Sequence, residues 1–387
     1  MTSCFDVIVA GVGAMGAATC SALARRGVRV LGLERFDIPH ALGSSGGHVR
    51  LIRKAYYEHP DYVPLLELAY RQWHALELRT RSSLLFQTGL VHAGRPDGEL
   101  IAGVRRAASR HGLAIAALDA QELAARMPPL HLPEGYVAIH EADGGFVLAE
   151  RSIVAFAQDA LAHGAELHAR ERIVHFEARE RGVHVVTERG AYDAARLVIT
   201  AGPHAPRFLA DLGVPLRVTR QVVAWVRPKR EAPFAYGAFP CYAIEGDPAE
   251  GAGLHYGFPA LPASFGAGPP ALKVGHHALG PLTDPELLDR GLGVGDEAGF
   301  RAGLARHLPD ANGPLLAAQV CMYTNSQDGH FILDRHPAHA SIALACGFSG
   351  HGFKFAPVIG EALADLVLEG RSALPIGFLS LARFERP

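Results

Sequence analysis

Three closely spaced glycines and one acidic residue near the start of the chain form the clearest chemical pattern in the sequence. The segment GVGAMG places Gly11, Gly13 and Gly16 between an apolar run and a helix-forming run. Gly11 permits a tight turn, Gly13 lets the backbone approach a pyrophosphate, and Gly16 lets a helix and a strand pack closely. Free N–H groups at the start of that helix would face the phosphates. Glu34 can accept hydrogen bonds from a ribose diol, which favours an adenosine without a 2′-phosphate.

A second group combines glycines with two arginines. The segment GSSGGHVRLIRKAY, residues 43–56, contains Ser44, Arg50 and Arg53. The two arginines are three residues apart and would share one face if the segment were helical. Two converging guanidinium groups need an anion, such as a substrate carboxylate or an electron-rich ring. The spacing alone leaves a solvated basic helix end open as an alternative. The preceding glycines favour a site, because they allow close approach of a flat ligand.

A third group lies near the C-terminus, in the segments CMYTNSQDGHFILDRHP (residues 321–337) and ACGFSGHGFKFAPVIGE (residues 345–361). In the second segment, glycines alternate with polar side chains just ahead of a predicted helix, at Gly347, Ser349, Gly350, His351, Gly352 and Lys354. Backbone N–H groups and a lysine at the start of a helix form a pocket suited to an anion. Taken singly, Lys354 is also explained as a solvated lysine, and Cys321 as a small core residue.

The elements that must position these residues are clearest at the start of the chain. Residues 5–10 are an apolar run, as expected of a parallel strand that is buried on both faces. Residues 17–26 are helix-forming and end at Gly27, a plausible C-cap, and residues 28–33 form a second strand. This βαβ unit predicts an α/β fold. Residues 216–280 are richer in aromatic residues and strand formers, with prolines and glycines between them.

The composition excludes several classes of protein. The 387 residues predict two to three folding units, since a domain has roughly 150 residues. With 49% hydrophobic and 20% charged residues, the chain is not intrinsically disordered. A net charge of -2 argues against nucleic-acid binding. Five cysteines without a CxxC pair predict neither a disulfide framework nor a zinc site. The uncharged run 7–24 contains three glycines, so we expect a strand, turn and helix there and no membrane span.

Together, these segments resemble the monomeric sarcosine oxidase family of flavoenzymes, which includes N-methyltryptophan oxidase and pipecolate and peroxisomal-type sarcosine oxidases. The resemblance spans residue 5 to about residue 370, and its C-terminal motifs are more specific than the glycine pattern. It implies an α/β fold with two parts. The expected parts are a Rossmann-type FAD-binding domain assembled from residues 1–80, 146–215 and 316–387, and a mixed-sheet substrate domain of residues 81–145 and 216–315.

The resemblance implies a cofactor and a set of residues that hold it. Cys321 stands where the family attaches FAD covalently, through a thioether to the 8α-methyl group. Arg50 matches the arginine beside the flavin ring, and Lys273 matches the lysine near flavin N5 that helps to activate oxygen. The expected cofactor-binding residues are Gly11, Gly13, Gly16, Glu34, Ser44, Cys321, Gly350 and Gly352. No metal is expected.

The resemblance also implies how a substrate is held. Arg53 and Lys354 match the pair of cations that binds the substrate carboxylate. Four further residues match positions that line the substrate cavity: Tyr256, His277, Tyr323 and His351. The residues expected to take part in catalysis are Lys273, Arg50, His277 and Tyr256.

Two positions beside the expected flavin ring depart from the family pattern. Gly46 stands where the family often has histidine, with His48 two residues further on. Val49 stands where the family has a threonine that helps to hold water near the flavin. These changes bear on oxygen reactivity and substrate preference and leave the fold prediction unaffected.

We therefore predict a cytoplasmic, monomeric amine oxidase that uses FAD, with an amino-acid substrate and O2 as its partners and with no nucleic acid or membrane. The predicted substrate is a small secondary amino acid: sarcosine, another N-methyl amino acid, pipecolate or proline. The products are an imine and H2O2. Three alternatives stay open: a FAD dehydrogenase that passes electrons to a quinone or carrier, an NAD-linked oxidoreductase that uses only the N-terminal βαβ unit, and a non-catalytic FAD-binding or scaffold protein.

Overall fold

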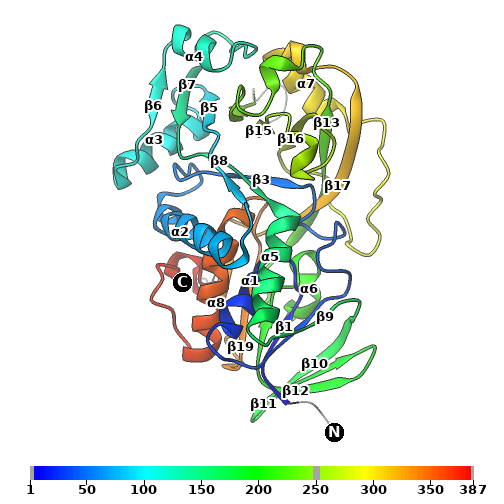
Figure 1. Cartoon of the computed structure of the whole chain (residues 1–387). Helices are drawn as coiled ribbons and strands as arrows, with labels where there is room; N and C mark the ends of the chain where they lie inside the picture. Colours follow the sequence, from blue (N-terminus) through cyan, green and yellow to red (C-terminus); the bar gives the residue numbers. More distant parts are fainter. Residues whose placement is uncertain (1–3, 247–252, 385–387) are drawn as a thin grey trace.

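The computed structural model describes residues 4–246 and 253–384 (Figure 1). Its strands form three sheets. In Figure 1 the first sheet and its helices lie at the bottom and the second sheet lies at the top. Strands β3 (Val49–Ile52) and β8 (Gly145–Leu148) of the third sheet run between them.

The first sheet has a parallel centre in the order β19-β12-β1-β2-β9. These strands are β1 (Cys4–Ala10), β2 (Val30–Leu33), β9 (Glu166–His168), β12 (Ala191–Ile199) and β19 (Ile342–Cys346). The antiparallel strands that extend it are β10 (Ile173–Arg179), β11 (Gly182–Thr187) and β18 (Ile332–Arg335). The sheet is thus assembled from three segments that are far apart in the sequence, as expected for the Rossmann-type domain.

Helix α1 (Ala14–Ala24) packs on this sheet between α5 (Ala149–Ala162) and α8 (Ala356–Glu369), and α2 (Val63–Thr80) packs against α5 and α8. The close approach of α1 and α8 depends on Gly360, because a Cβ atom there would lie 2.6 Å from the backbone carbonyl carbon of Ala18. A short helix, α6 (Ala205–Phe208), follows β12.

The predicted N-terminal βαβ unit is confirmed by β1, α1 and β2. Gly11 has a φ of +93°, a conformation that L side chains rarely adopt. The Thr200 hydroxyl, just after the end of β12, donates a hydrogen bond to the Gly11 carbonyl at 2.7 Å. This bond holds the turn after β1 against the end of β12. A Cβ atom at Gly16 would overlap the Gly11 carbonyl, so this position requires glycine for the helix to start where it does.

The second sheet is mixed and has the order β17-β13-β16-β15-β14-β5-β7-β6. Its strands are β5 (Leu90–Gly94), β6 (Ala116–Leu118), β7 (Val137–Glu141), β13 (Arg217–Val226), β14 (Cys241–Glu245), β15 (Leu254–Phe258), β16 (Leu272–His277) and β17 (Leu315–Asn325). The associated helices are α3 (Glu99–His111), α4 (Ala120–Arg126) and α7 (Ala298–His307). β17 belongs to this sheet, whereas the sequence division placed residues from 316 onward with the FAD-binding part; the exact division into domains stays a prediction.

The two faces of the second sheet have different surroundings, because side chains alternate along each strand. On one face, Ala224 and Val274 join a core with Phe300 and Leu304 of α7. Residues that alternate with these point to the opposite face of the sheet, which borders a large cavity. Cys321 of β17 lies on this cavity face. The alternation therefore separates a packing face from a face that is available for chemistry.

The expectation that Arg50 and Arg53 share a helix face is wrong. Residues 49–52 form β3, an antiparallel partner of β8 in which Arg50 lies opposite Val147. The third sheet also contains β4 (Leu85–Phe86). The aliphatic residues of VRLI pair with a strand that lies far away in the sequence, and this tertiary pairing overrides the helical spacing. Arg53 follows directly after the end of the strand.

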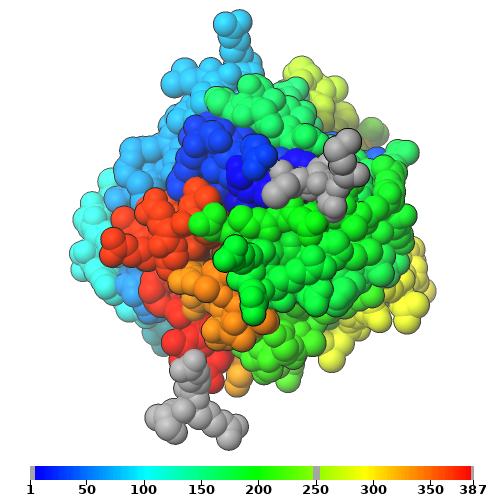
Figure 2. Space-filling view, turned by 90° about the horizontal axis from the view of Figure 1, so that it is seen from below, coloured from blue at the N-terminus to red at the C-terminus, as the bar shows by residue number. Residues whose placement is uncertain are grey.

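Segments from the whole length of the chain meet at one end of the molecule. Figure 2 shows the N-terminal part in blue, the middle part in green and the C-terminal part in orange and red, side by side on the end that the first sheet forms. None of the helices in the described ranges is long and apolar enough to cross a membrane.

Candidate active site

A cavity of about 500 Å³ runs from the first sheet to the second. It brings together residues from all three groups that the sequence singled out. The predicted site residues that line it are Gly11, Gly13, Glu34, Ser44, Arg50, Arg53, Tyr256, His277, Cys321, Tyr323, Gly350, His351, Gly352 and Lys354. Gly16 and Lys273 are not among the lining residues: Gly16 lies in the first turn of α1, and Lys273 is buried in β16.

At the nucleotide end, the structure fits an adenosine diphosphate group. The Glu34 carboxylate accepts hydrogen bonds from the N–H groups of Val12 at 2.8 Å and Phe36 at 3.0 Å, which fixes it at the end of β2. Burial alone would raise the pKa of Glu34, but His40 and these N–H groups outweigh burial and lower it. The Ser44 hydroxyl is buried and has no partner in the protein, as expected of a group that awaits a ligand. These residues suit the adenosine and phosphates of FAD.

Arg50 and Cys321 lie in the middle of the cavity. The Arg50 guanidinium donates to the carbonyl oxygens of Val49 at 3.0 Å and Ser44 at 3.1 Å, and also to that of Gly46. Cys321 is buried in β17, opposite Gln221 of β13. Burial raises the pKa of its thiol, although the positive charges of Arg50 and Lys273 act in the opposite direction.

Lys273 is 2% exposed. Its ammonium group donates to the carbonyl oxygens of Gly47 at 2.6 Å and Val49 at 2.8 Å, and it lies 5.0 Å from the centre of the Phe258 ring. Burial and the charge of Arg50 hold the pKa of Lys273 well below its ordinary value. The residue is thus a buried amine that is anchored on the turn before β3.

Arg53 and Lys354 meet at the far end of the cavity. They are 6% and 4% exposed, so neither is the solvated basic residue that the sequence left open. The Arg53 guanidinium lies 4.4 Å from the centre of the Tyr56 ring, and the Lys354 ammonium lies 5.1 Å from it. Lys354 donates to the carbonyl oxygen of His351 at 2.7 Å. Two buried cations therefore share one aromatic platform.

Glu58, which no sequence motif indicates, is the counter-ion of this pair. Its two oxygens each lie 2.6 Å from the Arg53 Nη2 atom. Burial alone would raise the pKa of the Glu58 carboxyl, but the charges of Arg53, His351 and Lys354 lower it to about 2. Burial and Arg53 hold the pKa of Lys354 well below its ordinary value. A lone acid five residues after an arginine carries no motif, so only the fold could reveal it.

Two tyrosines and two histidines enclose the same end. His277 Nδ1 lies 3.2 Å from the Tyr323 hydroxyl, and a Cβ atom at Gly350 would overlap the Tyr323 ring. Burial lowers the pKa of His277 to about 4 and that of His351 to about 3, and it raises that of Tyr256 to about 12. All three side chains are therefore uncharged at neutral pH. The charge at this end comes from Arg53, Glu58 and the protonated form of Lys354.

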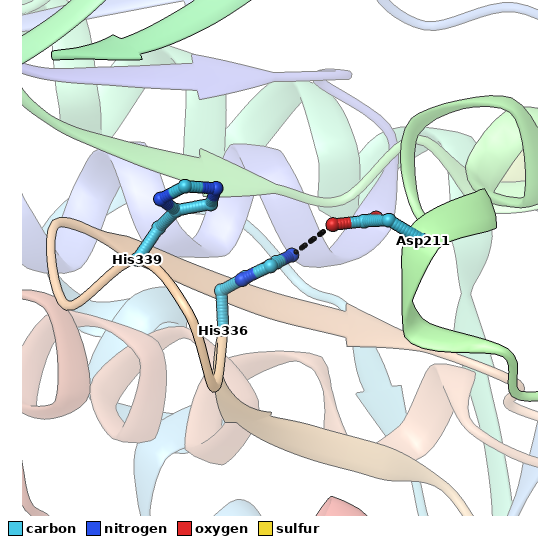
Figure 3. Close-up of side chains that lie close together, drawn as sticks. All are labelled: Asp211, His336 and His339. Atoms are coloured by element: carbon cyan, nitrogen blue, oxygen red, sulfur yellow. Dashed lines mark hydrogen bonds and ion pairs between the residues drawn. The ribbon is translucent and has the colours of Figure 1, made fainter.

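A separate cluster of possible metal ligands lies outside this cavity. Asp211, His336 and His339 are the one group of three such side chains within the described ranges whose ligand atoms lie within 4.8 Å of one another (Figure 3). His336 Nε2 lies 2.9 Å from the Asp211 carboxylate, and its Nδ1 accepts a hydrogen bond from the Ala338 N–H at 3.2 Å. Both ring nitrogens of this buried histidine thus have partners, which accounts for the cluster without a metal.

Comparisons with known proteins agree with this arrangement. Residues 6–366 match the family described as FAD dependent oxidoreductase. The chain is 42% identical to monomeric sarcosine oxidase of Streptomyces avermitilis, over 99% of this chain and 98% of that protein. It is 32% identical to N-methyl-L-tryptophan oxidase of Salmonella dublin, over 99% of this chain and 100% of that protein. The solved structure of NikD, an unusual amino acid oxidase essential for nikkomycin biosynthesis, matches with a TM-score of 0.85 at 26% identity and covers 98% of each chain.

Proposed function

The chain belongs to the family of FAD dependent oxidoreductases, and we propose that it is an oxidase of small secondary amino acids. The candidate substrates are sarcosine, another N-methyl amino acid, pipecolate and proline. Monomeric sarcosine oxidase and N-methyl-L-tryptophan oxidase support this class, because both are similar to the chain over nearly its whole length. In the proposed reaction the amino acid loses two electrons and two protons to become an imine, and O2 gains them to become hydrogen peroxide.

The buried cation pair at the far end of the cavity is the observation that carries this proposal. Arg53 and Lys354 lie there with Glu58 as their counter-ion. A substrate carboxylate that enters between them takes the place of Glu58 on Arg53 and favours the charged form of Lys354, since a nearby anion raises the pKa of an amine. Charge-assisted hydrogen bonds of this kind offset the cost of removing the carboxylate from water.

The remaining lining residues have roles in this scheme. Glu34, Ser44 and the N–H groups after Gly13 would hold the adenosine and phosphates. Gly350 and Gly352 make room for the rings of Tyr323 and Phe348 in the cavity wall. When bound, FAD supplies the two-electron redox chemistry that amino-acid side chains lack. Tyr256, Tyr323 and His277 enclose the substrate as neutral groups, so they exclude water without adding charge beside its amine.

We propose covalent attachment of the flavin at Cys321. The place of this thiol in the cavity wall supports it. The nearby charges of Arg50 and Lys273 support it too, because they favour the thiolate against the effect of burial. After acid denaturation, yellow fluorescence should stay with the wild-type chain and should be released from Cys321→Ser. The matched control is Cys346→Ser, another buried cysteine in the cavity wall. Flavin that stays bound to Cys321→Ser contradicts the attachment.

Lys273 distinguishes an oxidase from a dehydrogenase. A buried ammonium group stabilises the negative charge that develops as oxygen is reduced. In an oxidase, Lys273→Met should slow reoxidation of the reduced flavin by O2 far more than reduction of the flavin by the amino acid. Equal effects on both rates favour transfer of electrons to a quinone or carrier.

A peroxide assay tests the proposed reaction. Purified holoenzyme is mixed with sarcosine, pipecolate, proline or N-methyltryptophan in air, and hydrogen peroxide is measured. At least one of the four should give peroxide in proportion to the amount of enzyme. If none gives peroxide and none bleaches the flavin, the proposed substrate class is wrong.

We also propose that the enzyme is a cytoplasmic monomer. The name of its relative in Streptomyces avermitilis supports a monomer. Cys20, Cys241 and Cys346 are buried free thiols, which supports a reducing compartment. Size-exclusion chromatography with light scattering should give a mass near the chain mass of 41.2 kDa, and twice that mass contradicts the monomer.

A further inference from the structure

The anchor of Lys273 is a strained turn. The Val49 N–H donates to the Gly47 carbonyl at 2.8 Å, which closes a γ-turn around His48. His48 has a φ of 65°, a conformation that costs free energy for a residue other than glycine, and the Gly47 φ is also positive, at 100°. A turn of this kind persists only where surrounding contacts hold it.

Glu150 supplies these contacts from the first turn of α5. One of its carboxylate oxygens accepts hydrogen bonds from the N–H groups of Gly47 at 2.8 Å and His48 at 3.1 Å. The next backbone contact is also at the start of α5, where the Ala149 N–H donates to the His48 carbonyl at 2.7 Å. The second carboxylate oxygen is buried and has no hydrogen-bond partner, and the His48 Nδ1 atom lies 3.7 Å from it.

One peptide group joins Glu150 to Lys273. The bond between Gly47 and His48 presents its N–H to the Glu150 carboxylate and its C=O to the Lys273 ammonium. Negative charge at the N–H end and positive charge at the C=O end polarise the peptide in the same direction. The two hydrogen bonds therefore strengthen one another.

We propose that Glu150 is a positioning residue for oxygen reduction: it fixes the turn at residues 47–49 so that two carbonyl groups hold Lys273 in place as an ammonium ion. This inference rests on the proposed function, in which Lys273 acts on O2. Nothing in the sequence marks Glu150, because its partners lie about a hundred residues earlier in the chain.

The charges around Lys273 determine in which direction the loss of Glu150 changes the pKa of Lys273. The titratable groups that face it are Arg50 of β3, Glu150 of α5 and Cys321 of β17, and Glu150 is the one carboxylate among them. The other neighbours are the rings of Trp225 and Phe258. Burial and Arg50 lower the pKa of Lys273, whereas Glu150 raises it. An ionised Cys321 raises it as well, but its sulfur carries no charge once it is bonded to the flavin. Loss of the Glu150 charge should therefore lower this pKa further.

The test uses holoenzyme whose flavin is reduced by light in the presence of EDTA, so that no substrate is needed. Reoxidation after mixing with O2 is followed as a function of pH. With Glu150→Gln we expect reoxidation at pH 8 to be slower, because the turn that positions Lys273 is less well held. The fall in rate at high pH should move to lower pH by about one unit, because the ammonium form is lost earlier. Anaerobic reduction of the flavin should be unchanged.

Two further variants make the result decisive. Asp159→Asn removes another buried carboxylate of α5 that lies outside the cavity and should leave the pH profile as in the wild type. Glu150→Asp keeps the charge but withdraws it from the turn, so it should slow reoxidation without moving the profile. This variant also decides the question if Glu150→Gln does not fold, since a wild-type rate for it overturns the inference.

The possible failures are distinguishable. Wild-type rate and profile in Glu150→Gln, together with slow reoxidation in Lys273→Met, contradict the role of Glu150 alone. Slow reoxidation of the wild type that Lys273→Met does not alter contradicts the proposed oxidase function itself.

Discussion

At the scale of single residues, the substrate end of the cavity is balanced by one acid that the sequence did not reveal. Arg53 and Lys354 were predicted from the family resemblance, but each is common enough as a solvated residue to be ambiguous alone. Glu58 makes the burial of Arg53 possible, because a buried guanidinium without a counter-ion is strongly destabilising. The unliganded protein satisfies Arg53 internally, and a carboxylate ligand must compete with Glu58 for it.

This competition predicts how Glu58→Gln behaves. Without a ligand, the variant should lose about 3–5 kcal/mol of unfolding free energy, because Arg53 keeps a buried charge without its partner. Methoxyacetate, the oxygen isostere of sarcosine, should then raise the midpoint of thermal unfolding more in the variant than in the wild type. Glu141→Gln, which removes a buried acid outside the cavity, should lose stability without gaining this response. Equal ligand responses in Glu58→Gln and wild type contradict the competition.

At the scale of elements, local sequence patterns predicted those helices and strands whose formation depends mainly on neighbouring residues. The β1–α1–β2 unit followed from a glycine spacing that only a tight turn and a close helix explain. Strand β3 was not predicted, because its pairing with β8 is a tertiary contact. The spacing of Arg50 and Arg53 was considered only for a helix and carries no information about this pairing. Lys273 could be placed near a flavin only by resemblance, since its anchoring turn at residues 47–49 lies in a different segment.

The docking of α7 on the second sheet gives a test at this scale. A Cβ atom at Gly303 would overlap the His255 ring, whereas one at Gly299 would lie 3.4 Å from His276, an ordinary contact. Gly303→Ala should therefore lower the free energy of unfolding by about 1–3 kcal/mol through overpacking. Gly299→Ala should leave it unchanged or raise it, because alanine favours the helix. Urea unfolding measures both, and equal stability of the two variants would contradict this packing of α7.

At the scale of the whole molecule, one cavity lies between two sheets. Burial keeps histidines neutral both in the cavity wall and behind the second sheet. Burial, acting with the positive charge of Lys354 and the neighbouring His277, lowers the pKa of His351 to about 3 against the charge of Glu58, which raises it. Burial and the nearby His276 and His307 lower the pKa of His255, behind the second sheet, to about 4. These histidines therefore stay neutral in the folded protein at pH values where they are protonated in the unfolded chain, whose histidines have a pKa of about 6.5.

These histidines predict loss of stability in mild acid. Between about pH 6.5 and pH 4 the unfolded state binds more protons than the folded state, so the free energy of unfolding falls as the pH falls. Each histidine contributes a slope of up to about 1.4 kcal/mol per pH unit in this window. Urea unfolding at several pH values should show the decline, with a shallower slope in His255→Gln. A free energy of unfolding that stays constant from pH 7.5 to pH 5 is incompatible with neutral buried histidines.

The most direct measurement of the central claim is reduction of the bound flavin by substrate without oxygen. Holoenzyme is mixed anaerobically with sarcosine or pipecolate, and with the methyl ester of the same compound, while flavin absorbance is recorded. We expect rapid bleaching by the free amino acid and a much slower reaction with the ester, which lacks the carboxylate that Arg53 and Lys354 bind. Bleaching by neither compound, or at equal rates by both, contradicts the account.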